Sequence, residues 1–199
     1  MLEFIRANEA EHAAKMAQWI FESGTRFFSR LFGDADAAVA TLRSWIDRAD
    51  SEFSGTRAAL ALGDGKPVGM FIALAGAEIP RRRRADLLDL IKHSTAERRA
   101  ELKEHLATLN ELTAPVQDDE FYLRTVAVDE TERGRGFGHE LVERALHDGR
   151  AVGFQRFRLD VDCDNARALH LYRSFGFEII HEGRAATAGL HMYSLLLRD

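Results

Sequence analysis

A glycine-rich turn between a strand-like run and a helix-like run is the most constraining feature of this 199-residue chain. The turn is Arg133-Gly134-Arg135-Gly136-Phe137-Gly138; it follows the apolar run 122–128 and precedes the helix-like run 139–150. Glycines let backbone N–H groups approach a ligand closely, and a helix N-terminus adds a positive partial charge. The turn therefore predicts a cradle for a phosphate or pyrophosphate, although a tight strand–helix connection alone also uses glycines.

Two common phosphate-binding patterns fit this turn poorly. A P-loop requires a Lys-Ser/Thr pair after its glycines, whereas Gly138 is followed by His139 and Glu140. A dinucleotide-binding fold has an early βαβ unit and an acidic residue about 20 residues beyond its glycines. Asp160 lies near that distance, but the turn lies late in the chain. The spacing Arg-x-x-Gly-x-Gly instead resembles the pyrophosphate loop of the GNAT family of N-acetyltransferases.

A second block downstream carries the same resemblance. Asn165, Ala168 and Tyr172 match the family's Asn-x-x-Ala-x-x-x-Tyr pattern, which follows a strand and precedes a Gly-Phe turn, here at 176–177. In the family, the asparagine and the tyrosine face coenzyme A. The resemblance covers residues 120–177 well and residues 1–75 in outline, and it does not extend to residues 80–115.

The resemblance implies an α/β fold of the GNAT acyl-CoA acyltransferase type, with a central mixed sheet flanked by helices. The length and the 46% apolar content allow a single core, so residues 1–199 are expected to form one domain. Between the third and fourth strands lie more residues than an ordinary connection needs. Two apolar stripes predict an inserted helical hairpin at about 80–115, with Ser94 or Thr95 as a cap between its helices. The stripes are expected to pack on each other, on the domain or on a second chain; they are Leu87, Leu88, Leu90 and Ile91, and Leu102, Leu106 and Leu109.

Hydrophobic periodicity and breaker residues predict the remaining elements. Strands are expected at 2–7, 56–62, 67–75, 121–128, 156–162, 177–181 and 190–197. Helices are expected at 9–21, from Asp34 to about 48, at 136–152, and from Asp164 or Asn165 to near Gly176.

The resemblance implies acetyl-CoA as the cofactor. Backbone amides of Gly134, Arg135, Gly136, Phe137 and Gly138 would hold the pyrophosphate, and Arg133 and Arg135 would add charge-assisted hydrogen bonds unless they are merely solvated. The family's fourth strand bulges and splays from the fifth, so the backbone of Val126, Ala127 and Val128 would pair with pantetheine. Asn165 is expected to contact coenzyme A, to cap its helix, or to do both.

Tyr172 would protonate the leaving thiolate, because the ordinary pKa of a phenol, near 10, lies close to that of a thiol, near 8.5. The alternative is a core tyrosine. Glu120 is the candidate base, although Asp118, Asp119 and Glu120 equally suit a solvated loop. The family often has Glu or His on the fourth strand, where this chain has Tyr122 or Arg124. The single cysteine, Cys163, suits an inert small hydrophobic residue; the alternative is a nucleophile that accepts an acyl group, for which no basic partner is identifiable.

Composition narrows the remaining classes of function. The net charge of -5 argues against nucleic-acid binding, and a single cysteine rules out an intrachain disulfide. No zinc spacing, membrane span or signal peptide is visible, so a metal-free, soluble cytoplasmic protein is expected.

The sequence leaves the acceptor open between a small-molecule amine and a protein amino group. The residues that could contact it are the Arg81–Arg84 run and Phe27, Phe28 and Phe32. A non-catalytic acyl-CoA-binding module and a partner-binding domain, including a homodimer through the inserted helices, are the alternatives.

Overall fold

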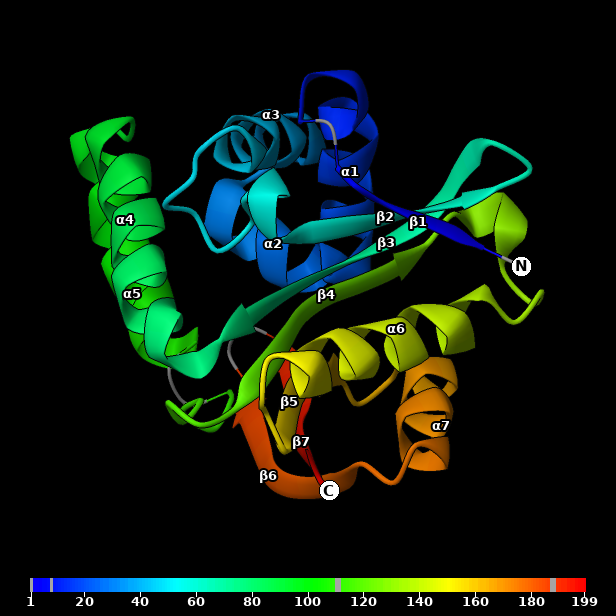
Figure 1. Cartoon of the computed structure of the whole chain (residues 1–199). Helices are drawn as coiled ribbons and strands as arrows, with labels where there is room; N and C mark the ends of the chain where they lie inside the picture. The colour runs from blue at the N-terminus through cyan, green and yellow to red at the C-terminus, as the bar shows by residue number, and fades with distance from the viewer. Residues whose placement is uncertain (1, 8, 110–111, 187–188) are drawn as a thin grey trace.

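A mixed seven-stranded sheet organises the part of the chain that the computed structural model describes, residues 2–7, 9–109, 112–186 and 189–199 (Figure 1). The strand order is β1-β2-β3-β4-β5-β7-β6. The strands are β1 (Glu3–Arg6), β2 (Ala58–Gly63), β3 (Lys66–Ala75), β4 (Phe121–Val128), β5 (Arg156–Asp162), β6 (Glu178–Ala185) and β7 (Leu190–Arg198). The helices are α1 (Glu9–Ser23), α2 (Thr25–Phe32), α3 (Ala35–Ile46), α4 (Ile79–Lys92), α5 (Ala96–Leu109), α6 (Phe137–Ala151) and α7 (Ala166–Ser174), with short 3₁₀ turns η1 (Gly55–Arg57), η2 (Gly76–Glu78) and η3 (Glu130–Glu132).

Helices cover both faces of the sheet, and strand β3 accordingly carries apolar side chains on both of its sides. Helices α6 and α7 lie on one face, and α1, α2 and α3 lie on the other (Figure 1). Strand β3 contributes Phe71 and Ala73 to the core under α6, whereas its Met70 and Ile72 belong to the core under α1 and α3. The predicted fold class is confirmed: this is an α/β architecture with a mixed, two-sided sheet.

Strands β4 and β5 form the only parallel pair among the described strands, and they separate early. They pair at Phe121 with Phe157 and at Tyr122 with Arg158, and at no later described position. Beyond Tyr122, β4 remains paired with β3 alone. The sheet therefore opens at its centre, between two halves that are each antiparallel.

The inserted hairpin is confirmed as α4 and α5 between β3 and β4. The hydroxyl of Thr95 accepts a hydrogen bond from the Arg98 backbone N–H, so Thr95 caps α5 as predicted. Helix α4 packs on the segment 45–52 and α5 reaches α2, where Arg98 donates to the Leu31 carbonyl. The pair lies at the side of the molecule opposite the glycine turn (Figure 1).

The predicted burial of the α4 stripe is wrong in part. Leu88 is 56% exposed and Ile91 is 36% exposed, whereas Ile79, Arg82 and Asp86 are buried. Arg82 donates to the Ala49 and Ser51 carbonyls, and Asp86 accepts from the Ser51 hydroxyl and the Glu52 N–H. These bonds to a distant loop hold the polar face of α4 inward. On the α5 stripe, Leu102 is buried, and the side chain of Leu109 lies outside the described residues.

Helix α2 replaces the irregular segment expected at 25–32. Gly24 still separates it from α1, but Phe28 and Phe32 lie one turn apart and both are buried. Phe28 also packs against Phe53. The aromatic residues of this segment therefore belong mainly to the core.

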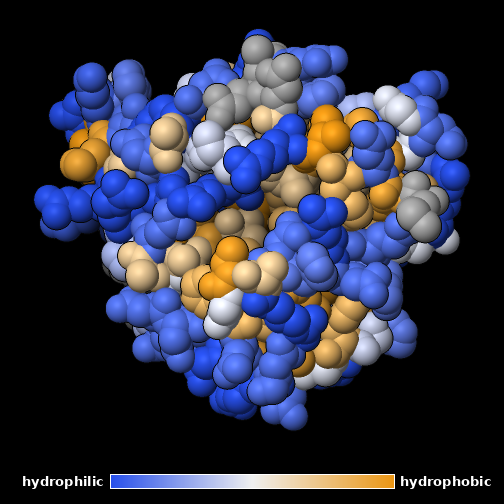
Figure 2. Space-filling model, viewed as in Figure 1, coloured by the Kyte–Doolittle hydropathy of each residue, from blue (hydrophilic) through white to orange (hydrophobic). Residues whose placement is uncertain are grey.

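Apolar residues gather toward the middle of the face shown in Figure 2, and its outline is mainly hydrophilic. A smaller apolar area lies over the end of the α4–α5 pair (Figure 2). No described helix combines the length and the apolar character that crossing a membrane requires.

Candidate functional site

A bulge in β4 sits next to the point where β4 and β5 separate. Ile72 of β3 lies opposite Thr125 and the next residue, Ala73, lies opposite Leu123, so Arg124 has no partner in β3. The extra residue reverses the alternation of the strand. Leu123 before the bulge and Val126 and Val128 after it all contact the core under α6. The predicted bulge and splay are confirmed, and the free edge of β4 runs along residues 123–128.

The glycine turn lies between η3 and the first turn of α6. Gly134 has φ +90° and Gly136 has φ +87°, values in the left-handed region that favours glycine. Within the described chain, no protein group accepts a hydrogen bond from the backbone N–H groups of residues 134–138. These five consecutive amides lie at a helix N-terminus, where the helix dipole is positive. They are the amides predicted to bind a pyrophosphate, and their free donors fit such a group.

Three arginines surround the turn. Arg133 donates from Nε to the Val128 carbonyl at 3.3 Å, and Arg135 pairs with Glu132 and lies over the Phe137 ring. Both side chains remain about half exposed, which leaves them able to reach an anion. The third, Arg167 of α7, has its Nη2 3.6 Å from the place where a side chain on Gly134 would begin. Sequence reasoning missed Arg167, although it stands between the matching positions Asn165 and Ala168.

Helix α7 packs against the first turn of α6, which brings the second sequence block to the glycine turn. A Cβ on Gly138 would lie 3.3 Å from Leu171, and the His139 and Phe175 rings are 4.5 Å apart. The Asn165 side chain accepts from the Ala168 N–H at 3.1 Å, so its capping role is confirmed. Its contact with coenzyme A stays a prediction.

Tyr172 is 8% exposed and packs against Phe177 in the core under α6. Burial raises the pKa of Tyr172 to about 12. None of the described residues forms a hydrogen bond with its hydroxyl group, and that oxygen is not among the fully buried polar atoms that lack a partner, so it is open to solvent. The hydroxyl is therefore available to a ligand.

Glu120 lies at the closed end of the β4–β5 pair, apart from the residues above. Its side chain accepts from Arg156 Nη2 at 2.8 Å and from the Gln117 N–H at 3.0 Å. It is 2% exposed, and about 13 Å of strand separates it from Arg124 at the bulge. The structure does not bring Glu120 to the open part of the strands, and both of its carboxylate oxygens already have donors.

A cluster of charged residues occupies the opposite face of the open strands. Glu52, which precedes η1, accepts from Arg83 Nε at 2.9 Å and from Arg124 Nε at 3.2 Å. Beside them, the Tyr122 hydroxyl donates to Asp160 at 2.9 Å, and Asp160 pairs with Arg158 at 2.9 Å. Glu52 and Asp160 were not among the predicted site residues. The cluster joins residues far apart in sequence, so no local spacing signals it.

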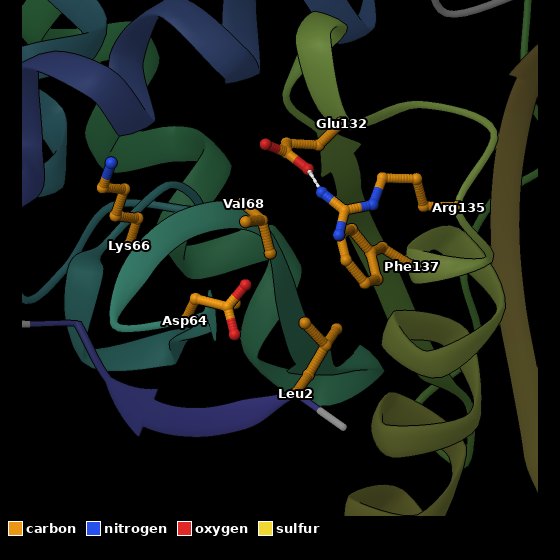
Figure 3. A pocket seen from close by; sticks show the side chains of 8 residues that line it. Leu2, Asp64, Lys66, Val68, Glu132, Arg135 and Phe137 are labelled. Atoms are coloured by element: carbon orange, nitrogen blue, oxygen red, sulfur yellow. Dashed lines mark hydrogen bonds and ion pairs between the residues drawn. The ribbon is translucent and has the colours of Figure 1, made fainter.

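A hollow of about 420 Å³ lies beside the glycine turn, toward the β2–β3 hairpin (Figure 3). Its walls are Leu2, Gly63, Asp64, Lys66, Val68, Glu132, Arg135 and Phe137. Arg135 and Glu132 meet across its rim (Figure 3). The described lining contains no residue of α7, so the hollow adjoins the turn on the side away from Tyr172.

Cys163 follows β5 and is only partly buried. Burial raises the pKa of its thiol, which opposes formation of the reactive thiolate. The structure thus supports the interpretation of Cys163 as an inert residue.

Asp129, the residue after β4, links the segment that leads into the glycine turn to helix α1. Its carboxylate accepts from Trp19 Nε1 at 3.2 Å and from the Thr131 hydroxyl at 2.7 Å, and it pairs with Lys15 at 2.5 Å. The bonds from Lys15 and Thr131 hold the pKa of Asp129 well below its usual range. A depressed pKa adds stability above the unfolded-state value, near 3.9, and that stability is lost as the pH falls toward the native pKa.

Replacing Asp129 with Asn should therefore lower the free energy of unfolding at pH 7 by about 2 kcal/mol. The same change should flatten the loss of stability between about pH 4 and pH 2, because the titrating group is gone. Urea unfolding across this pH range tests both effects. Asp118→Asn, at an exposed loop position, is the matched control and should change neither. Equal acid sensitivity of wild type and Asp129→Asn would contradict the assignment.

Comparisons with known proteins agree with this geometry. A sequence model described as "Acetyltransferase (GNAT) family" matches residues 14–177. The fold is similar to that of an N-acetyltransferase from Staphylococcus aureus Mu50, with a TM-score of 0.72 at 17% identity over 98% of this chain and 100% of that chain. It is also similar to a chain of the NatC complex bound to Gag peptide and CoA, with a TM-score of 0.56 at 14% identity over 100% of this chain and 98% of that chain.

One relative matches only a segment. "Uncharacterized protein ML0378" of Mycobacterium leprae (strain TN) is 43% identical over 61 residues, which is 31% of this chain and 16% of that protein. This chain therefore spans a small part of that relative. The structural similarities, all at low identity, concern the fold.

Proposed function

Because this chain belongs to the GNAT acetyltransferase family, we propose that it transfers an acetyl group from acetyl-CoA to a primary amine. The observation that carries the proposal is the row of five unpaired amides at residues 134–138, set beside the free edge of β4. A pyrophosphate matches such donors at a helix N-terminus. The free strand edge suits the amide groups of pantetheine.

The cofactor supplies the activated acetyl thioester. The chain positions it through the turn amides, with Arg133, Arg135 and Arg167 contributing charge, and through the backbone of Val126, Ala127 and Val128. The opening between β4 and β5 gives the thioester access to the far face of the sheet. Direct attack by an amine bound on that face then requires no covalent intermediate on the protein.

Tyr172 is the proposed proton donor to the departing thiolate. Its hydroxyl has no protein partner among the described residues, and α7 holds it near the glycine turn. Its high pKa keeps the proton on the oxygen at neutral pH. Asn165 holds the first turn of α7 in place and is also a proposed coenzyme A contact.

Glu120 stays the predicted base, but its carboxylate is buried and already accepts from Arg156 and from the Gln117 N–H, so the structure gives no support for direct proton transfer to it. The acceptor is proposed to be a small-molecule amine or a protein amino group. We further infer a single domain over residues 1–199 and a cytoplasmic location.

Isothermal titration with acetyl-CoA and CoA, followed by a thiol-release screen against amines, tests the proposal. Binding with turnover of at least one amine is expected. Binding without turnover would favour the alternative, a non-catalytic acyl-CoA-binding or partner-binding module. Failure to bind either ligand would overturn the assignment of the glycine turn.

A further inference from the structure

Two arginines from distant parts of the chain converge on one buried carboxylate beside the open strands. The Glu52 side chain is 5% exposed and accepts one hydrogen bond from each arginine. Arg83 comes from the inserted helix α4, and Arg124 is the bulged residue of β4. A carboxylate between two like charges offsets their repulsion and fixes their relative position.

Each arginine uses only its Nε–H in this contact. The terminal Nη groups of Arg83 and Arg124 have no partner within the described chain. A guanidinium carries five N–H donors in a planar fork, so four on each side chain remain free. The Arg83 side chain is 56% exposed and that of Arg124 is 17% exposed, and no nitrogen of either is among the fully buried polar atoms without a partner, so the free donors are accessible to solvent.

Packing holds Arg124 in place without engaging its outer nitrogens. Its guanidinium lies 4.3 Å from the Phe53 ring centroid and 6.0 Å from that of Phe28. Stacking on aromatic rings suits arginine and leaves its in-plane donors free for an oxyanion. The site is therefore preorganised, which reduces the entropy lost on binding.

The charge of the whole cluster favours a monoanion. Arg83 and Arg124 oppose Glu52, and Arg158 offsets Asp160, which leaves a net charge of +1 among these five side chains. The two parts are close enough to interact: burial and Asp160 raise the pKa of Tyr122, whereas Arg124 and Arg83 oppose that rise. One carboxylate brings the sum to zero, and a phosphate dianion would leave a surplus negative charge in a partly buried site.

The position of Arg124 relates this site to the proposed reaction. It lies two residues before Val126 along β4, about 7 Å at the usual rise of a strand. Its side chain lies on the face that carries α2 and α3, whereas Tyr172 belongs to the core under α6. A carboxylate bound by the two arginines would therefore lie within the length of one small molecule from the position expected for the thioester.

We propose that Arg83 and Arg124, bridged by Glu52, bind a carboxylate of the acceptor, so that the acceptor is a small amino acid or a close derivative whose amine lies a few bonds from that carboxylate. This inference rests on the proposed acetyl transfer. It gives the inserted helix α4 a role in choosing the substrate, because α4 supplies the more exposed arginine.

The test uses matched pairs of amines in two assays. Glycine, L-alanine, L-methionine and L-phenylalanine are each compared with the corresponding C-terminal amide, and O-phosphoethanolamine represents a dianion. Titration into protein saturated with CoA measures binding without turnover, and thiol release from acetyl-CoA measures kcat/KM. For at least one pair, we expect wild type to bind the amino acid about tenfold more tightly than its amide, equivalent to about 1.4 kcal/mol.

Arg83→Gln should abolish this preference by weakening amino-acid binding about tenfold while leaving the amide unchanged. The ratio of variant to wild type cancels the different basicities of the two amines. Arg84→Gln, which removes the same charge from the next residue of α4, is the control and should keep the preference, because no described hydrogen bond or ion pair joins Arg84 to Glu52. Arg124→Lys keeps the charge but removes the fork, and should also reduce the preference.

Three outcomes would overturn the carboxylate site. They are equal binding of amino acid and amide in every pair, undetectable binding of both in every pair, and an equal loss of affinity for amino acid and amide in Arg83→Gln. Tighter binding of O-phosphoethanolamine than of every amino acid would overturn the choice of a monoanion. Selective binding without thiol release would leave the carboxylate site standing and overturn the acetyl transfer. The experiment therefore distinguishes failure of the carboxylate site from failure of the proposed acetyl transfer.

Discussion

Replacing Tyr172 with Phe should lower kcat by about a hundredfold while the affinity for CoA stays close to that of wild type. The phenylalanine ring still packs against Phe177, so only the proton donor is lost. Since no described residue hydrogen-bonds the Tyr172 hydroxyl, its removal breaks no internal bond, and the free energy of unfolding should not fall. Steady-state kinetics, titration with CoA and urea unfolding measure the three quantities.

The pH dependence adds an independent check on Tyr172. Its pKa is raised to about 12, so the hydroxyl stays protonated from neutral pH to about pH 10. The ratio of kcat between wild type and Tyr172→Phe should therefore remain constant over that range. A ratio that collapses near pH 8 or 9 would show that Tyr172 itself loses its proton there and would contradict its raised pKa. Full turnover in the variant would return Tyr172 to a purely structural role.

The central part of the fold was predictable because its signals are local. Strand β4 was expected at the residues observed, and β5 likewise; α6 begins one residue later than predicted. Glycines that need a positive φ, helix caps such as Asp34 and Thr95, and alternating apolar residues all act within a few positions of the chain. The bulge and splay came from the family resemblance, and no local pattern indicates them.

The inserted helix shows where local reasoning ends. An apolar stripe predicts burial of Leu88 and Ile91, but the orientation of α4 is decided by bonds from Arg82 and Asp86 to a loop more than thirty residues away. The cluster of Glu52, Arg83 and Arg124 has the same origin, with Glu52 and Arg124 72 positions apart. Periodicity reports the residues on one face of a helix, and it does not report which face the rest of the chain covers.

Replacing Gly136 with Val should weaken CoA binding at least tenfold, equivalent to about 1.4 kcal/mol. Gly136 precedes α6 with φ +87°, where a β-branched residue is strained, and its amide belongs to the unpaired row at 134–138. An added Cβ on Gly136 would have no other protein atom within 4 Å, so the new side chain enters open space and not the core. Titration calorimetry with CoA measures the loss.

Strain alone also predicts a less stable α6, so the effect on binding has to be separated from an effect on folding. Gly153, just beyond the C-terminus of α6, offers the matched control: it has φ +95° and likewise no atom within 4 Å of an added Cβ. Gly153→Val should therefore carry a similar backbone strain at the far end of the same helix. If the turn amides bind the pyrophosphate, only Gly136→Val loses affinity, even where both variants lose the same stability. Equal CoA affinity in the two folded variants would instead show that the glycine turn serves only to connect β4 to α6.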